Sequence, residues 1–230
     1  MLEQLKQEVF EANVTLQASG LVIFTWGNVS GRDLETGLVV IKPSGVRYDA
    51  MGAKDMVVVN LDGEVVEGKL RPSSDTPTHL ELYRRFRDVG GVAHTHSIFA
   101  TAWAQAKRPL PCLGTTHADS FRGTIPVTAD LSAKALAGDY ERETGRAIVA
   151  AFENLDPLQI PAVLVASHGP FTWGPNPAAA VENSIILEQV AQMAALTVAL
   201  CPDVQPIASA LLDKHFLRKH GADAYYGQRR

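Results

Sequence analysis

The chain has 230 residues, of which 46% are hydrophobic and 20% charged, and its formal net charge is -4. This composition is ordinary for a soluble globular protein, and a chain of this length can bury a sizeable core. It offers no basic face for nucleic acid, and Cys112 and Cys201 are too few for a disulfide framework. We expect no apolar run near the roughly 20 residues that a membrane helix requires. With no apolar signal core at the N-terminus, the composition predicts a cytoplasmic protein with reduced thiols.

Helical and extended hydrophobic patterns follow one another along the chain. The predicted helices cover 2–18, 76–86, 97–106, 132–154, 178–200 and 206–219. The predicted strands cover 21–25, 37–41, 56–61, 64–66, 90–96, 125–128 and 162–166. Asp62-Gly63 is a hairpin turn signal, Thr76 before Pro77 fits a helix N-cap, and 115–122 reads as a loop. The short connections favour one α/β domain over residues 1–230, with a mixed or mostly antiparallel central sheet covered by helices.

Two histidines lie two positions apart on the strand predicted at 90–96. Side chains alternate along a strand, so His94 and His96 point to the same face and can reach one cation. His168, at the end of the buried run 162–166, and Asp75, before a helix, are the candidate third and fourth ligands. Such a donor set suits Zn²⁺ or Mn²⁺. In isolation, His168 could equally be a hydrogen-bonded loop histidine, and Asp75 more simply a helix cap.

Small and polar residues at two turns indicate an anion pocket. Lys42, Ser44 and Gly45 follow one strand, and Ser73-Ser74 precede a helix. Backbone N–H groups approach an anion closely at such places, helix N-termini favour phosphate, and a lysine adds positive charge. Asn28 is a further candidate. An ordinary turn followed by an ordinary helix cap explains the same residues without any ligand.

The four other histidines show no such pairing. They read as residues on a helix face or on the surface: His79, His117, His215 and His220.

Taken together, several short motifs resemble the class II aldolase and L-ribulose-5-phosphate 4-epimerase family. These motifs are Gly27-Asn28-Val29-Ser30, Lys42-Pro43-Ser44-Gly45, Ser73-Ser74-Asp75-Thr76, His94-Thr95-His96, Gly114-Thr115-Thr116-His117-Ala118-Asp119, His168-Gly169-Pro170, Leu212-Asp213-Lys214-His215 and Tyr225-Tyr226-Gly227-Gln228. The resemblance runs almost end to end and is nearest to the epimerase branch. Arg229 and Arg230 extend past the last motif.

The resemblance implies a role for each matching residue. Metal would be bound by Asp75, His94, His96 and His168, and substrate phosphate by Asn28, Lys42, Ser44, Gly45, Ser73 and Ser74. Asp119 and Tyr226 match the acid/base pair of the epimerases. It further implies the three-layer fold of class II aldolases and a homotetramer of four-fold symmetry. Its sites would lie at subunit interfaces, where the tail tyrosine reaches a neighbour's site.

The implied reaction is a metal-dependent conversion of L-ribulose 5-phosphate to D-xylulose 5-phosphate, as in arabinose breakdown. Carbon 4 carries no acidic proton, so inversion would proceed by retro-aldol cleavage and rejoining of the C3–C4 bond. The expected metal is Zn²⁺, with Mn²⁺ or Co²⁺ as alternatives. One alternative function is a class II aldolase, although those lyases typically carry Glu where Asp75 stands. The other is a non-catalytic protein that binds metal or a sugar phosphate.

Overall fold

The computed structural model describes residues 2–227 and is organised around one seven-stranded sheet. The strands are β1 (Gly27–Arg32), β2 (Val39–Ile41), β3 (Val57–Val59), β4 (Val65–Glu67), β5 (Gly91–Thr95), β6 (Ala162–Val165) and β7 (Gly169–Gly174). Their order across the sheet is β4-β3-β2-β1-β5-β7-β6, and every neighbouring pair is antiparallel. The predicted fold class is therefore confirmed.

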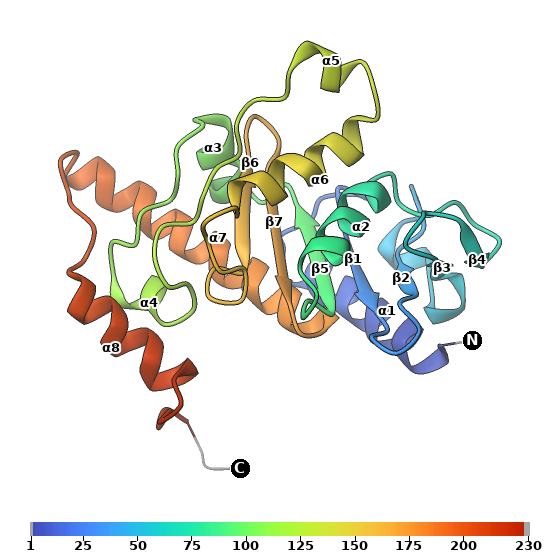
Figure 1. Cartoon of the computed structure of the whole chain (residues 1–230), viewed down its shortest axis with the longest axis horizontal. Helices are drawn as coiled ribbons and strands as arrows, with labels where there is room; N and C mark the ends of the chain where they lie inside the picture. The colour runs from blue at the N-terminus through green and yellow to red at the C-terminus, as the bar shows by residue number, and fades with distance from the viewer. Residues whose placement is uncertain (1, 228–230) are drawn as a thin grey trace.

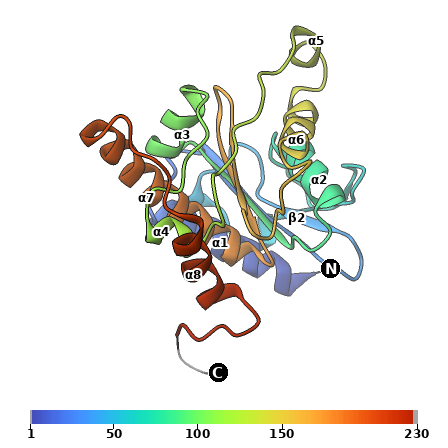
Figure 2. The same cartoon turned by 60° about the vertical axis from the view of Figure 1, so that its left-hand side comes forward.

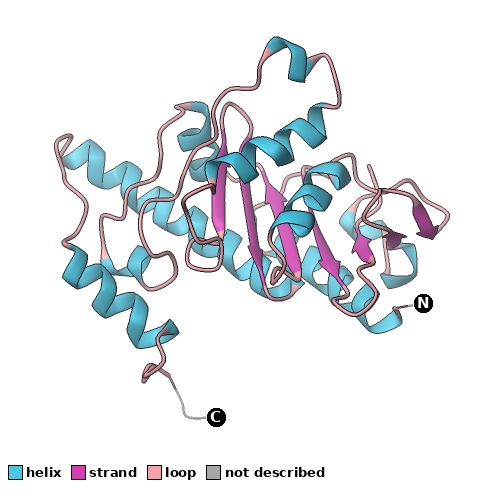
Figure 3. Ribbon diagram, in the orientation of Figure 1, coloured by secondary structure: helices cyan, strands magenta, loops and turns pink. Residues whose placement is uncertain are grey.

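Helices cover both faces of the sheet. The α-helices are α1 (Glu3–Ala18), α2 (Thr76–Arg85), α3 (Ile98–Gln105), α4 (Thr115–Ala118), α5 (Ala133–Leu136), α6 (Tyr140–Ala151), α7 (Pro177–Leu200) and α8 (Ser209–His220). Two short 3-10 turns, η1 (Tyr48–Ala50) and η2 (Ala53–Asp55), precede β3. In Figures 1 and 3, α2 and α6 lie in front of the sheet, while α1 and α7 cross behind it. Figure 2 shows the same three layers from the side.

Burial on both faces explains the continuous apolar runs in the strands. In β2, Val39 and Ile41 join the cluster that contains α2, whereas Val40 between them packs with α1. In β5, Val92 and Ala93 divide in the same way. Such runs are typical of sheets covered on both sides. His94 therefore lies on the same face as Val92, toward α2.

Two of the predicted strands were wrong, and two observed strands, β1 and β7, were not predicted. Residues 21–25 form a turn in which Ile23 and Phe24 are 54% and 68% exposed, and Phe24 has a φ of 56°. A bulky residue in this left-handed region cannot continue a strand, so β1 begins only at Gly27. Residues 125–128 form isolated bridges instead of a ladder. Conversely, β7 begins at Gly169, where the sequence suggested a chain break.

The helices also depart from the prediction in detail. The helical stretch predicted at 132–154 is two helices, α5 and α6, which residues 137–139 separate. The loop predicted at 115–122 contains the single turn α4. Thr76 is the first residue of α2 instead of its cap, and its hydroxyl donates to the Ser73 carbonyl at 2.6 Å.

The long helix α7 also corrects an expectation about hydropathy. By length and composition it could cross a membrane, with a mean hydropathy of 1.2 over its most apolar 18 residues, of which 33% are buried. In this structure one side of α7 packs against β5 and β7. Glu188 on that side accepts the backbone N–H groups of Phe99 and Ala100, at 2.8 and 2.9 Å, at the start of α3. An apolar helix with a buried carboxylate in this position fits a core helix.

The two glycines before β5 are required by packing. A Cβ on Gly91 would lie 2.3 Å from the Asn176 backbone, and one on Gly90 would lie 2.1 Å from the Pro175 carbonyl. The start of α7 therefore approaches β5 at backbone distance. Both predicted free cysteines are confirmed, with Cys112 buried and Cys201 exposed.

Candidate metal and anion site

Three histidines converge at one end of the central strands. His94 lies on β5, His96 follows it, and His168 lies in the turn between β6 and β7. Their ring centroids are 4.8 to 5.0 Å apart, and one ring nitrogen from each lies within 4.8 Å of the others. The predicted meeting of these three side chains is confirmed, and the group they form could hold a metal ion.

The hydrogen bond of His94 fixes which of its nitrogens faces this group. His94 Nδ1 lies 2.9 Å from the Pro170 carbonyl oxygen, which can only accept, so Nδ1 carries the proton. The other nitrogen, His94 Nε2, faces the group and lies 3.1 Å from His96 Nε2. The His94 ring also stacks on Phe171, with centroids 4.1 Å apart. Metal-bound histidines are held in this way, by a hydrogen bond on the nitrogen that does not bind the metal.

The turn before β7 presents His168 to the other two histidines. Val165 pairs with Gly169, so only three residues connect β6 to β7, and Ser167 among them has a φ of 61°. A Cβ on Gly169 would lie 2.8 Å from the Thr95 carbonyl, so glycine is needed for the close approach of β7 to β5. His168 Nδ1 lies 3.3 Å from the Tyr140 hydroxyl at the start of α6.

Desolvation favours the neutral form of two of these imidazoles, His96 and His168. It lowers the pKa of His168 to about 4, with a further contribution from His94 and His96, and it lowers the pKa of His96 in the same direction. Neutral imidazole is the form that binds a metal ion. The donor set therefore fits a divalent cation such as Zn²⁺.

The fourth predicted ligand, Asp75, stands apart from the three histidines. It is not in the group whose atoms lie within 4.8 Å, and its Oδ2 accepts a 2.6 Å hydrogen bond from Asn28 Nδ2. Burial raises the pKa of the Asp75 carboxyl, but His94, His79 and the Asn28 bond outweigh that effect and the pKa falls below its ordinary value. Asp75 is thus an ionised carboxylate near the histidines.

The predicted anion loops form the opposite wall of the same space. The two loops that contain Ser44 and Ser73 are joined by an antiparallel pair of backbone hydrogen bonds. The Ser44 N–H donates to the Arg71 carbonyl, and the Ser73 N–H donates to the Lys42 carbonyl. These two N–H groups are therefore already used. The serine hydroxyls and the N–H groups of Gly45 and Ser74 are the remaining donors toward an anion.

Lys42 is more deeply buried than a simple phosphate-binding lysine. Only 2% of it is exposed, and its ammonium donates to the carbonyls of Val46, at 2.7 Å, and Pro43, at 3.3 Å. It also lies 4.8 Å from the centroid of the Tyr48 ring. Burial lowers the pKa of Lys42 to about 8. In this arrangement Lys42 stabilises the 43–46 turn directly.

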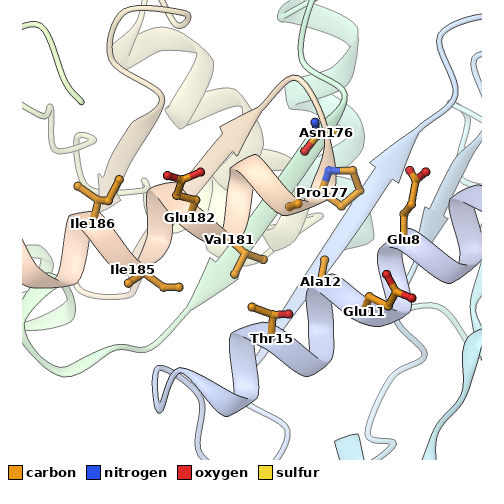
Figure 4. Close-up of a pocket in the computed structure, with 11 residues that line it drawn as sticks. Glu8, Glu11, Ala12, Thr15, Asn176, Pro177, Val181, Glu182, Ile185 and Ile186 are labelled. Atoms are coloured by element: carbon orange, nitrogen blue, oxygen red, sulfur yellow. The ribbon is translucent and has the colours of Figure 1, made fainter. Parts of the chain in front are cut away.

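One cavity of about 520 Å³ joins all these groups. It is lined by Thr25, Trp26, Gly27, Asn28, Lys42, Pro43, Ser44, Gly45, Ser73, Ser74, Asp75, His94, His96 and His168. The structure therefore brings together the ten residues expected to bind metal and phosphate. A second cavity, of about 690 Å³ between α1 and α7, is lined by Glu8, Glu11 and Glu182 and contains no histidine (Figure 4).

The two residues predicted as the acid/base pair lie elsewhere in the chain. Asp119, just after α4, accepts hydrogen bonds from His215 at 2.9 Å and from Arg218 at 2.9 Å. The Tyr226 ring covers the same region of α8, 4.9 Å from the Arg218 guanidinium and 4.5 Å from the Lys219 ammonium. Within the described residues, neither Asp119 nor Tyr226 lines the histidine cavity.

The charges around Asp119 keep it ionised. Burial raises the pKa of its carboxyl, but hydrogen bonds from Arg218 and His215 outweigh that effect and lower the pKa. His220 Nε2 contacts the Asp119 carbonyl at 2.9 Å, so His215 and His220 are not the isolated surface residues that their sequence context suggested. The sequence motif that includes Gln228, and the following Arg229 and Arg230, end outside the described residues.

Sequence reasoning missed two polar contacts of the site. Tyr140 contacts His168, yet it lies 28 residues away in the chain, within a stretch read only as helical. His79 was assigned to a helix face, but it is fully buried and its Nδ1 lies 2.7 Å from the Ser30 hydroxyl. The only sign in the sequence that His79 lies near the site was its position on the predicted helix, one turn after Asp75.

The fold and site define the class: an α/β protein whose antiparallel sheet lies between helix layers and carries three converging histidines that could hold a metal ion. The chain matches the description Class II Aldolase and Adducin N-terminal domain over residues 7–195, and it belongs to this family.

Solved structures agree with the family. An L-fuculose 1-phosphate aldolase is 26% identical, with a TM-score of 0.75, over 92% of this chain and 94% of its own. The L-fuculose-1-phosphate aldolase from Thermus thermophilus is 25% identical, with a TM-score of 0.65, over 89% of this chain and 99% of its own. YgbL from Klebsiella pneumoniae, named for aldolase, epimerase or decarboxylase activity, is 24% identical, with a TM-score of 0.73, over 93% of this chain and 99% of its own. At that identity YgbL supports the fold alone.

Proposed function

We propose that this chain is a metal-dependent sugar-phosphate enzyme that converts L-ribulose 5-phosphate to D-xylulose 5-phosphate by cleaving and rejoining the C3–C4 bond. The observation that carries the proposal is the shared cavity, in which a histidine triad faces serine- and glycine-rich loops. A small sugar phosphate matches its volume of about 520 Å³ and its two chemically different walls.

His94, His96 and His168 would hold the cation, which we propose is Zn²⁺, with Mn²⁺ or Co²⁺ as alternatives, and Asp75 would be the fourth ligand. When bound, the cation supplies Lewis-acid polarisation of the substrate oxygens, worth several kcal/mol of developing charge. Asn28, Lys42, Ser44, Gly45, Ser73 and Ser74 would hold the phosphate. Retention of the phosphate would keep the cleaved aldehyde in the cavity long enough for it to rotate and present its other face when the C3–C4 bond reforms.

The acid/base roles belong to Asp119 and Tyr226 in this proposal. One group would take the proton of the C4 hydroxyl as the C3–C4 bond breaks, and the other would return a proton on the opposite face as it reforms. Both residues lie away from the cavity of their own chain. The proposal therefore includes a homotetramer with sites between subunits, in which one copy supplies Asp119, after α4, and the tail beyond α8 to a neighbour's cavity.

A class II aldolase that releases its aldehyde is the second candidate. It is favoured by the solved relatives that are named L-fuculose 1-phosphate aldolases. The epimerase is favoured by Asp75, since those lyases typically have Glu at this position. In either case we propose that residues 1–230 form a single domain of a cytoplasmic enzyme.

The two activities are separable in one experiment. Purified protein of measured metal content is given L-ribulose 5-phosphate, and D-xylulose 5-phosphate is followed with a coupling enzyme. In parallel it is given dihydroxyacetone with glycolaldehyde phosphate, and aldol product is measured. Epimerisation that is much faster than net aldol formation supports the proposal, whereas rapid aldol formation alone supports the lyase.

Two substitutions test the acid/base assignment. We expect Asp119→Asn and Tyr226→Phe to keep metal content and fold while lowering turnover by about 10²- to 10⁴-fold. Wild-type turnover in both variants would refute these roles. Asp213→Asn is a matched control, because Asp213 is a carboxylate on α8 that pairs with Arg122.

A further inference from the structure

The contact between Asn28 and Asp75 joins the two halves of the cavity. Asn28 belongs to the phosphate group of residues and Asp75 to the metal group, yet they share a 2.6 Å hydrogen bond. Only 3% of Asn28 is exposed, and its Oδ1 has no hydrogen-bond partner among the described residues. A buried amide with one end unpaired is an incompletely satisfied arrangement.

The orientation of the amide follows from the carboxylate. Ionised Asp75 can only accept, so Asn28 must direct its NH₂ group toward it. An anion that accepted a hydrogen bond from the same NH₂ group would lie next to the Asp75 carboxylate, and these two negative charges would repel each other. Anion binding at Asn28 and the present position of Asp75 therefore oppose each other.

Of the two residues, Asp75 is the one that can move. Asn28 lies within β1, where it pairs in register with His94 of β5, so its backbone is fixed by the ladder. Asp75 precedes α2, and its side chain makes no capping hydrogen bond to that helix. The Asn28 bond is the single side-chain hydrogen bond recorded for the Asp75 carboxylate within residues 2–227.

We propose that Asn28 couples the anion loops to the metal site: it holds Asp75 away from the three histidines until an anion occupies the amide and Asp75 turns to the cation. The inference rests on the proposed metal and phosphate roles of this cavity. Coupling of this kind is reciprocal, so the cation and the anion tighten each other's binding by the same factor. A cation site that is complete only with phosphate present would favour phosphorylated sugars over free ones.

The test measures metal affinity without turnover. Chelator-treated full-length protein is titrated with Co²⁺, with and without inorganic phosphate, and the visible absorption of Co²⁺ reports its coordination. For the wild type we expect phosphate to tighten Co²⁺ binding by about 10-fold, within the usual range of coupling, and to change the spectrum. Calorimetric titration of phosphate, with and without Co²⁺, should give the same factor.

The direction in which Asn28→Leu changes Co²⁺ affinity decides between the two possible roles of Asn28. If Asn28 restrains Asp75, this variant binds Co²⁺ more tightly than the wild type when phosphate is absent, and phosphate then adds little. If Asn28 instead supports Asp75 as a ligand, the variant binds Co²⁺ more weakly without phosphate, and the proposal is overturned. In an Asp75→Asn background, Asn28→Leu should leave Co²⁺ affinity unchanged.

A second variant separates the coupling from ordinary phosphate loss. Ser74→Ala should weaken phosphate binding but leave Co²⁺ affinity without phosphate at the wild-type value, because Ser74 has no recorded contact with the Asp75 carboxylate. Binding of both ions with no coupling in the wild type would overturn this inference and leave the proposed function standing. Failure to bind Co²⁺ at all would overturn both.

Discussion

The histidine cavity and the Asp119 cluster differ in how complete each is within one chain. In the cavity, ten expected residues from five segments line one space, and three imidazoles already face one another. In the cluster, Asp119 is paired with His215 and Arg218, and Tyr226 lies over the same helix α8, but no part of it lines the cavity. The candidate metal and anion site is therefore complete within one chain, whereas the proposed proton transfers would need a second copy.

The largest expected effect is a loss of bound metal when a histidine of the cavity is replaced, but not when a histidine of the Asp119 cluster is replaced. His96→Ala removes a proposed ligand, so we expect metal affinity to fall by more than the roughly 10- to 100-fold typical of residues that only support a ligand. Metal content after dialysis, measured by atomic spectroscopy, checks this. His220→Asn is the control, since His220 contacts Asp119. Equal metal loss in both variants would contradict the distinction between the regions.

The two regions should also differ in their response to acid. Burial lowers the pKa of His168 in the cavity to about 4 and that of His79 on α2 to about 3. The unfolded chain then binds more protons below pH 6.5, so metal-free protein loses stability as the pH falls from 6.5 toward 4. We expect a loss on the order of 2 kcal/mol for each histidine between pH 7.5 and 5.

Urea unfolding at several pH values measures this loss. The lowered pKa of Asp119 acts in the same direction but in a lower pH window, because its stabilisation is lost only as the pH falls below about 3.8. The Asp119 cluster therefore contributes no loss above pH 5. A His79→Leu variant should show a shallower pH dependence than the wild type, and an unchanged slope would contradict the assignment.

A smaller effect concerns the support behind the cavity. Glu188 accepts two backbone N–H groups at the start of α3, directly after the strand that carries the histidines. Glu188→Ala leaves the buried Ala100 N–H and the partly buried Phe99 N–H unpaired, so we expect a loss of roughly 2 to 3 kcal/mol in the free energy of unfolding. Chemical denaturation checks it, with the exposed Glu182→Ala on the same helix as control. A similar loss in both variants would mean that the capping contact is not responsible.

The smallest expected effect is at Tyr140. Its hydroxyl lies 3.3 Å from His168 Nδ1 and helps orient that ring. We expect Tyr140→Phe to lower metal affinity by about 10-fold, at the low end for outer residues of a metal site, and to leave the free energy of unfolding of the metal-free protein nearly unchanged. Competition with a coloured chelator measures the affinity. No change in affinity would show that the Phe171 stack and the hairpin turn position the histidines without Tyr140.

Local pattern was sufficient for part of the site. His94 and His96 could be placed on one face because side chains in a strand repeat every two residues, a rule that holds without knowledge of any neighbour. His168 could be placed at a strand end by the apolar run before it. The resemblance of short motifs then joined these local predictions into one cavity.

Other parts failed because their causes are not local. The apolar run 21–25 satisfies a strand pattern, yet it forms a turn, with Phe24 in the left-handed region. β7 was missed because Gly169 and Pro170 usually interrupt a strand, whereas this glycine is needed where β7 approaches Thr95. Gly90 and Gly91 are likewise needed because the backbone at the start of α7, far along the chain, leaves no room for a Cβ.

By itself, the sequence determined the alternation of strands and helices, the class of fold, and the histidine and anion motifs, because each depends on the period or chemistry of a short stretch. Only the tertiary structure decided that Asp75 is bonded to Asn28 and that Asp119 faces the cations of α8. Those contacts join residues 47 and 99 positions apart. Long-range packing sets such pairs, and no local pattern of polar residues specifies which partner each side chain meets.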